Sequence, residues 1–151
     1  MPDIMNAKFR RGALAAAALT LSLTAATQLW AHGNVTPQPV DTSALPDIPG
    51  GNDHWVEHNP YRGNPTAIKI GESAYGQNCA RCHGLEAISG GIAPDLRLLE
   101  TGDTGDEWFI YRYQHGSVRD GKVYMPPLGP ILGQKAGWAI RSWLETVHTD
   151  D

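Results

Sequence analysis

Apolar and polar residues follow different periods along the chain, and these changes divide it into three parts. The first is a continuous apolar run at residues 12–26, rich in Ala and Leu. The second, residues 32–66, contains six of the eleven prolines, a density that leaves neither a helical nor a strand period. Helical periods begin near residue 67, and no segment predicts a convincing strand. The pattern predicts a small all-α domain that follows an extended Pro/Gly-rich arm.

The last predicted helix has the clearest pattern, because its apolar residues recur at steps of three and four. This apolar stripe consists of Leu132, Ala136, Ile140, Trp143 and Val147. The polar residues of the segment fall on its other faces, namely Gln134, Lys135, Arg141 and Glu145. We expect the stripe to pack against the rest of the domain.

Two shorter helices are predicted upstream. One covers about residues 72–80 and places Tyr75 and Cys79 one turn apart. The other covers about residues 104–113 and begins with Thr-Gly-Asp-Glu, the spacing of a capping box. Trp108 and Arg112 lie on one face of that second helix.

The N-terminal apolar run is typical of a secretory signal peptide. Lys8, Arg10 and Arg11 precede the run, which is too short to span a bilayer, and small residues follow it. Cleavage after Ala26 and cleavage after Ala31 both fit, and an uncleaved anchor is the alternative. The sequence predicts an exported protein.

Removal of residues 1–31 makes the remaining chain more acidic. The whole sequence has 12 Lys and Arg and 16 Asp and Glu. The first 31 residues hold three of the basic residues and one of the acidic residues, so 9 basic and 15 acidic residues are left. The remaining 120 residues suit a single domain. The acidic balance argues against nucleic acid or an anionic membrane as partner.

The only two cysteines lie in the segment Cys79-Ala80-Arg81-Cys82-His83. In an exported protein, Cys-x-x-Cys-His is the attachment sequence of a c-type haem, whose vinyl groups form thioethers with both sulfurs. On a helix these three side chains project from one face, with the imidazole placed to bind iron. A redox dithiol needs a preceding strand, and a zinc site needs more ligands, so both fit less well.

A haem iron bound by His83 has a second axial position. Met125 is the best candidate, because it lies in the proline-rich segment Tyr124-Met-Pro-Pro-Leu-Gly-Pro130, which can form a rigid loop. His115 and His148 are the other candidates, and an open position is a further alternative. The Pro94 carbonyl is expected to accept from the second nitrogen of His83. The expected haem propionate donors are Trp108, Arg97, Arg112 and Tyr113.

Two further histidine patterns are weak. His54-Trp-Val-Glu57-His58 matches an inverted zinc-protease motif, but prolines and glycines on both sides exclude the helix that this motif needs. His32 would be able to chelate copper as a mature N-terminus, but no second ligand histidine is identifiable.

Residues 67–148 resemble a class I cytochrome c. The resemblance rests on Gly71, Tyr75, Cys79-x-x-Cys82-His83-Gly84, Pro94-Asp95-Leu96, Met125-Pro126 and the C-terminal aromatic helix. It implies that the first and last helices cross beside one covalently attached haem c, with Gly71 and Tyr75 set against Ile140 and Trp143. Residues 149–151 form a tail.

A narrower resemblance extends into the arm. The segments 31–37, 59–64 and 78–96 are similar to the c-550 cytochromes of quinoprotein ethanol oxidation. It implies a monomeric periplasmic carrier, not an enzyme, that takes electrons from a pyrroloquinoline-quinone (PQQ)-dependent alcohol dehydrogenase. The acceptor would be a terminal oxidase or another cytochrome of the respiratory chain. It also favours cleavage before His32. The alternatives are a different periplasmic partner, or a haem enzyme such as a peroxidase with an open sixth site.

Overall fold

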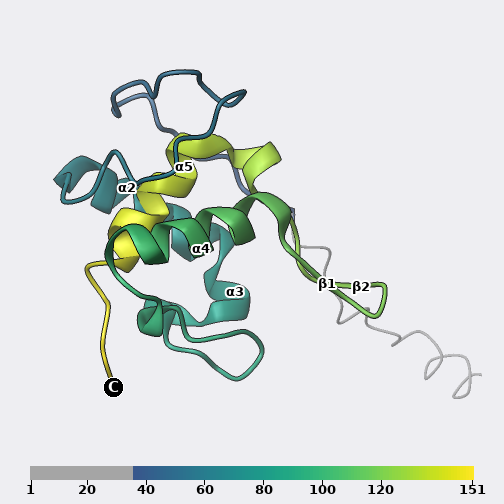
Figure 1. Ribbon diagram of the computed structural model, residues 1–151. Coiled ribbons are helices and arrows are strands. Elements are labelled where there is room, and N and C mark those ends of the chain that lie inside the picture. The colour runs from purple at the N-terminus through teal and green to yellow at the C-terminus, as the bar shows by residue number, and fades with distance from the viewer. Residues whose placement is uncertain (1–35) are drawn as a thin grey trace, which may run out of the picture. The chain divides into compact units, whose positions relative to one another are not determined.

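The computed structural model describes residues 36–151, and the expected signal segment, both cleavage sites and His32 lie outside them. The described elements are α2 (Pro65–Asn78), α3 (Ala80–His83), α4 (Gly102–His115), β1 (Ser117–Arg119), β2 (Lys122–Met125) and α5 (Gly129–Leu144) (Figure 1). Two short 3-10 turns, Leu85–Ala87 and Leu96–Leu98, join α3 to α4. The expectation of a mostly helical fold is confirmed. None of the helices among residues 36–151 has the length and apolar character needed to cross a membrane.

Helices α2 and α5 cross in close contact at Gly71. A Cβ atom on Gly71 would lie 1.9 Å from the backbone oxygen of Ala139 and 2.9 Å from the nitrogen of Ile140. One turn further along α2, the rings of Tyr75 and Trp143 pack against each other at a tilt of 39°, with centroids 4.5 Å apart. The crossing of the first and last helices, which the family resemblance implied, is therefore confirmed.

The prediction of a helix that places Tyr75 and Cys79 one turn apart is confirmed, but its bounds were wrong, because α2 begins seven residues before the predicted start. The Asn64 side chain accepts hydrogen bonds from the backbone nitrogens of Thr66 (2.9 Å) and Ala67 (3.1 Å). Pro65 occupies the first turn, where its missing N–H costs nothing. The proline that seemed to belong to the arm thus starts the helix.

Helix α4 begins at Gly102, two residues before the predicted capping box. Its N-cap residue, Thr101, makes no side-chain capping bond. The backbone nitrogen of Gly102 instead donates to Oε1 of Glu145 at 3.0 Å. A carboxylate from the far end of the chain supplies the negative charge that a helix N-terminus favours. The predicted capping box was wrong because the cap is tertiary. Arg112 lies 5.4 Å from the ring centre of Trp108, as their shared face predicted.

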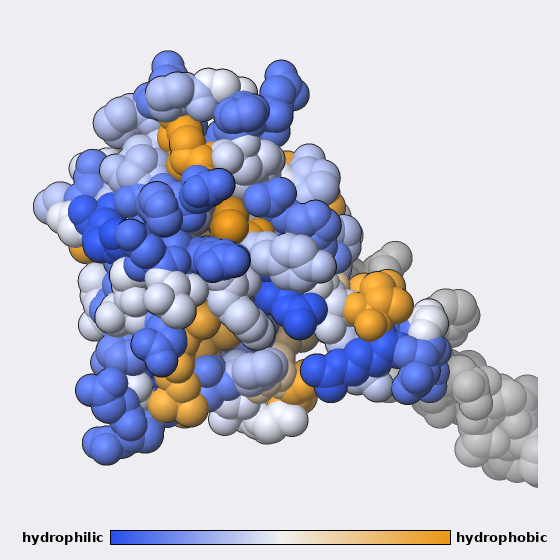
Figure 2. All heavy atoms as spheres, viewed as in Figure 1, coloured by the Kyte–Doolittle hydropathy of each residue, from blue (hydrophilic) through white to orange (hydrophobic). Residues whose placement is uncertain are grey.

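The prediction of no strands was wrong for residues 117–125, which form an antiparallel hairpin. Val118 pairs with Val123, and Arg119 pairs with Lys122. Asp120 and Gly121 form the turn with φ of 49° and 72°, the left-handed conformations that a two-residue primed turn requires. Figure 2 shows hydrophobic and strongly hydrophilic residues next to one another where the hairpin of Figure 1 projects.

Helix α5 is buried on more than its predicted stripe. Gln134 and Arg141, which lie on the other faces, are each only 1% exposed. Gln134 accepts from the backbone nitrogen of Val56 (3.2 Å) and donates to the carbonyls of Gly51 and His54. Residues of the Pro/Gly-rich arm therefore cover these faces, so the described part of the arm is packed. The helix ends at Leu144, before the last stripe residue.

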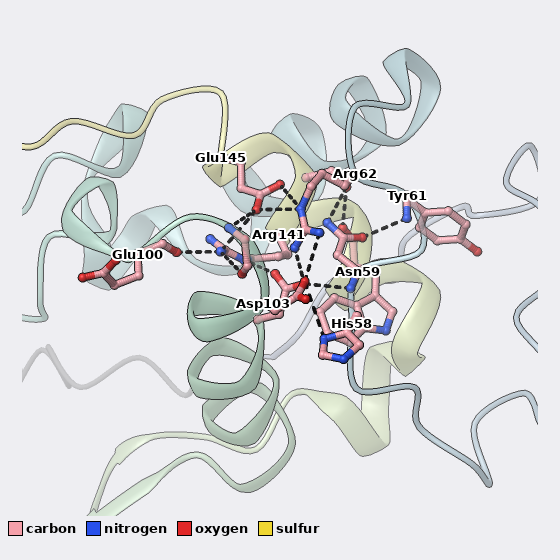
Figure 3. Close-up of polar contacts among 12 residues, drawn as sticks. His58, Asn59, Tyr61, Arg62, Glu100, Asp103, Arg141 and Glu145 are labelled. Atoms are coloured by element: carbon pink, nitrogen blue, oxygen red, sulfur yellow. Dashed lines mark hydrogen bonds and ion pairs between the residues drawn. The ribbon is translucent and has the colours of Figure 1, made fainter.

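A buried ionic network also holds the arm to α4 and α5 (Figure 3). Asp106 is fully buried, and its two oxygens accept from Arg141 Nε at 2.8 Å and from Arg62 at 2.5 Å. The backbone nitrogen of Asn59 donates to the same carboxylate at 2.8 Å, and the Asn59 amide donates to Ser142 at 2.9 Å. A buried carboxylate is tolerated here because charged and polar donors surround it.

Candidate haem-binding site

The Cys-x-x-Cys-His segment begins where α2 ends. Cys79 is the C-cap of α2 and the N-cap of α3, and its helical φ and ψ of −116° and −36° keep the two helices nearly continuous. The nitrogens of Cys82 and His83 both donate to the Cys79 carbonyl, at 3.1 and 3.0 Å. The three side chains therefore keep the helical spacing i, i+3, i+4 and share one face. Both thiols are free and half-buried.

The environment of Cys79 differs from that of a redox dithiol. Burial, with a smaller effect from Cys82, raises the pKa of the Cys79 thiol to about 12. Reactive Cys-x-x-Cys pairs have the opposite property, a lowered thiol pKa in a positive environment. The raised pKa of the Cys79 thiol therefore argues against thiol–disulfide exchange.

The imidazole of His83 is oriented by Pro94. Its Nδ1 lies 2.9 Å from the Pro94 carbonyl oxygen, which can only accept, so Nδ1 carries the proton. The tautomer leaves Nε2 unprotonated, with a lone pair available to a metal ion. The predicted role of Pro94 is confirmed.

Asp95 holds the loop that carries Pro94, a role that the sequence interpretation missed. Its carboxylate accepts from the backbone nitrogens of Ser89 (3.2 Å) and Arg97 (3.0 Å). It also accepts from the Arg97 guanidinium at 3.0 and 2.8 Å. These bonds, led by the one from Arg97, hold the pKa of Asp95 well below its usual value. The signal for this role was the local spacing Asp-x-Arg after the proline.

The turn after His83 requires glycine. Gly84 has φ of 86°, and a Cβ atom there would lie 1.8 Å from the carbonyl oxygen of Ile88. The Tyr75 hydroxyl donates to the Gly84 carbonyl at 2.8 Å, which ties this turn back to α2. Burial, the main cause, raises the pKa of Tyr75 and keeps its hydroxyl a donor.

Met125 is the last residue of β2 and lies opposite Ser117. It is half-buried and packs against the main hydrophobic cluster. The backbone is held on both sides of Met125. Gly116 approaches so closely that a Cβ atom there would lie 2.3 Å from the Met125 carbonyl oxygen. Further along, the backbone nitrogen of Leu128 donates to the Tyr113 carbonyl at 2.9 Å. The prediction of one rigid loop over residues 124–130 was wrong, because Tyr124 and Met125 end β2 and Gly129 and Pro130 begin α5.

The two alternative histidines differ from each other. His115 is exposed, stacks on Tyr111 with ring centres 4.6 Å apart, and donates from Nδ1 to the Tyr111 carbonyl at 2.9 Å. His148 Nε2 lies 3.1 Å from Asp150, whereas its Nδ1 is buried without a hydrogen-bond partner among the described residues. His148 is thus the alternative against which Met125 needs to be tested.

The proposed propionate donors are partly engaged elsewhere. Arg97 is bonded to Asp95, and the Tyr113 hydroxyl donates to the Gly133 carbonyl at 3.1 Å. Arg112 lies over the rings of Trp108 and Tyr111, at 5.4 and 5.9 Å, and makes one long hydrogen bond of 3.4 Å to the Gly116 carbonyl, whereas Trp108 is half-exposed. Arg112 and Trp108 therefore remain the better candidates to donate hydrogen bonds to a propionate.

A different group of potential metal ligands lies apart from the cysteine motif. Among residues 36–151, the cluster of three such side chains consists of His58, Asp103 and Asp106. Arg62 contacts both carboxylates, at 3.2 and 2.5 Å, and Arg141 contacts Asp106 at 2.8 Å, so each carboxylate already has a cationic partner. The H-x-x-E-H segment that contains His58 lies in bends and irregular backbone, without the helix that its zinc-protease interpretation needs.

Comparisons with known proteins agree with this geometry. The family model described as cytochrome C oxidase, cbb3-type, subunit III matches residues 66–144. Cytochrome c550 of Pseudomonas aeruginosa is 57% identical over 145 residues, which cover 93% of this chain and 95% of that protein. No solved structure matches the chain.

Two enzymes of Pseudomonas putida match over shorter stretches. Quinohemoprotein alcohol dehydrogenase ADH IIB is 42% identical over 60 residues, 40% of this chain and 8% of the enzyme. Quinohemoprotein alcohol dehydrogenase ADH-IIG is 49% identical over 41 residues, 26% of this chain and 6% of the enzyme. With the helical fold and the Cys-x-x-Cys-His sequence, the full-length match shows that the chain belongs to the class I cytochrome c family and is an electron-transfer protein carrying covalently bound haem c.

Proposed function

We propose that Cys79 and Cys82 form the two thioethers and that His83 and Met125 are the axial ligands. The observation that carries this proposal is the Nδ1 contact of His83 with Pro94, since it leaves the other ring nitrogen free to bind iron. Haem c supplies a one-electron iron couple, and His/Met ligation raises its reduction potential. The chain itself fixes the imidazole tautomer and holds the backbone around Met125 at Gly116 and Leu128.

The proposed physiological role is that of a periplasmic carrier between a PQQ-dependent alcohol dehydrogenase and a terminal oxidase or another cytochrome. Support comes from the two quinohemoprotein alcohol dehydrogenases, each of which contains a short stretch similar to this chain. We infer that this stretch is the haem-bearing part of those enzymes. A separate cytochrome with a similar domain is suited to exchange electrons with proteins of that class.

The proposed mature protein begins at His32, after a signal peptide at residues 1–31, and is a monomer. Its proposed parts are the arm at residues 32–66, the haem domain at 67–148 and the tail at 149–151. The N-terminal charges and apolar run support export. Sequencing the mature N-terminus from periplasmic extract tests this processing, and a start at Thr27 would place the cut after Ala26.

Reduction by a purified quinoprotein alcohol dehydrogenase tests the proposed partner. Oxidation of an alcohol to an aldehyde releases two electrons and two protons, so two molecules of a monohaem carrier are reduced for each alcohol consumed. We expect this 2:1 ratio in stopped-flow absorbance, with no reduction when alcohol is omitted. Failure to reduce the haem would remove this class of donor, and the different-partner alternative would then stand.

Carbon monoxide tests the alternative of an open sixth site. With both axial positions filled by His83 and Met125, the reduced protein is expected to bind the gas slowly or not at all at neutral pH. Rapid binding would favour a haem enzyme such as a peroxidase.

A further inference from the structure

Most cations that form no ion pair within residues 36–151 lie on the β1–β2 hairpin or at its base. Residues 36–151 contain nine Lys and Arg, and four of them form ion pairs with carboxylates: Arg62, Arg97, Lys135 and Arg141. The other five, which have no carboxylate partner within this part of the chain, are Lys69, Arg81, Arg112, Arg119 and Lys122. Arg81 belongs to the cysteine motif. Arg112 lies in the last turn of α4, and Arg119 and Lys122 lie on the hairpin. Lys69 alone lies elsewhere, on α2.

The β1–β2 hairpin carries two of these cations on an exposed ribbon. Arg119 and Lys122 are cross-strand partners, so their side chains share one face. Tyr124 lies on the same face by alternation, and Arg119 stands 5.6 Å from the centre of its ring. Asp120, in the turn, is the one acidic residue of the hairpin.

The opposite face of the hairpin is apolar. Val118 and Val123 pair across it and are 62% and 65% exposed, and Tyr124 on the cationic face is 61% exposed. No described residue covers these side chains, although a two-stranded ribbon on its own is marginally stable in water. Exposed apolar side chains beside Arg and Tyr are the composition of a protein contact surface (Figure 2).

We propose that this hairpin docks the cytochrome on its electron donor and meets an acidic, partly apolar patch of that protein. The inference rests on the proposed function. Charge complementarity selects the partner. An acidic patch on the donor attracts the cations of the hairpin and Arg112 at its base. The same patch repels the rest of the chain, which is acidic. The docked chain is thereby turned so that Met125, at the end of β2, lies next to the donor.

Matched charge reversals of two exposed lysines test this docking surface. The second-order rate constant for reduction by the quinoprotein alcohol dehydrogenase is measured at low ionic strength for wild type, Lys122→Glu, Lys122→Arg and Lys69→Glu. We expect Lys122→Glu to lower the rate constant on the order of tenfold and Lys122→Arg to keep it, since electrostatic steering accounts for such factors. Lys69→Glu, with the same change of net charge, is expected to change it less than about twofold because salt screens charges outside the contact.

The outcomes separate this inference from the proposed donor. Suppose that the dehydrogenase reduces wild type, and that Lys122→Glu and Lys69→Glu are reduced with equal rate constants. This result overturns the docking surface and leaves the proposed donor intact. If wild type is not reduced at all, the donor is wrong, and oxidation of the reduced cytochrome by ferricyanide decides the inference. Slower oxidation of Lys122→Glu than of Lys69→Glu then supports a cationic contact face for another protein, and equal oxidation overturns it.

An anionic membrane is the competing occupant of a cationic, apolar hairpin. Co-sedimentation with phosphatidylglycerol vesicles at physiological ionic strength distinguishes it. Two results together would make the hairpin a membrane contact and overturn protein docking. Wild type would bind the vesicles and Lys122→Glu would not, and the dehydrogenase would reduce both proteins at the same rate. Absence of vesicle binding supports the protein partner.

Discussion

The contact between α2 and α5 at Gly71 predicts a large effect for the smallest possible side chain. In Gly71→Ala the new methyl carbon would lie 1.9 Å from the Ala139 oxygen, whereas ordinary contacts are about 3.5 Å. The neighbouring atoms are backbone, so relief requires α5 to move by about 1.5 Å. Overpacking of this kind lowers the free energy of unfolding by about 3 kcal/mol, and the better helix propensity of Ala raises it by about 1 kcal/mol. We therefore expect a net loss of about 2 kcal/mol in the free energy of unfolding.

Urea unfolding of the haem-loaded protein, followed by far-UV circular dichroism, measures this loss. The matched control is Gly76→Ala in the same helix, where nothing lies within 4 Å of the added carbon. The free energy of unfolding of Gly76→Ala is expected to rise by up to about 1 kcal/mol, because Ala has the better helix propensity. In thermal unfolding, Gly71→Ala should lower Tm by about 8 °C. If the two variants were equally stable, the close helix crossing described here would be refuted.

Two further changes test the ionic contacts of the fold. Asp106→Asn removes the buried carboxylate that pairs with both Arg141 and Arg62, and it leaves Arg141 only its longer contact with Glu145 at 3.4 Å. Urea unfolding should therefore show a loss of about 3 kcal/mol in the free energy of unfolding, whereas the exposed Asp103→Asn should lose less than about 1 kcal/mol. Similar losses for the two variants would contradict the buried network. The depressed pKa of Asp95 means that its bonds stabilise the fold above the carboxyl's ordinary pKa and are lost as pH falls through and below that value. Asp95→Asn should therefore be less stable at pH 7 and lose less stability between pH 5 and pH 3 than wild type, and an unchanged pH dependence would count against this role.

The sequence predicted those features that arise from a local period or a short motif. The stripe of α5 and the helical spacing of Cys79, Cys82 and His83 belong to this class, since each depends on residues within a few turns. The Pro94 contact was also predictable, because a metal-binding imidazole needs an acceptor for its second nitrogen.

The missed features depend on residues distant in sequence or on very short elements. Helix α4 starts early because its N-terminus is capped by Glu145, 43 residues away from Gly102. The hairpin strands have three and four residues, too few for an alternation to stand out, although Asp120-Gly121 was a usable turn signal. Partial packing of the arm was predictable from its aromatic residues Trp55 and Tyr61, and Tyr61 is buried, but no period reveals which residues these side chains contact.

The proposal that His83 and Met125 complete the iron coordination is the centre of this account, and the far-red absorption band of the oxidised protein tests it most directly. A thioether ligand gives ferric haem c a weak band in this region. We predict that wild type shows the band, that Met125→Ala loses it, and that His115→Ala and His148→Ala keep it. A band that survives Met125→Ala, or that is absent from wild type, would contradict the assignment.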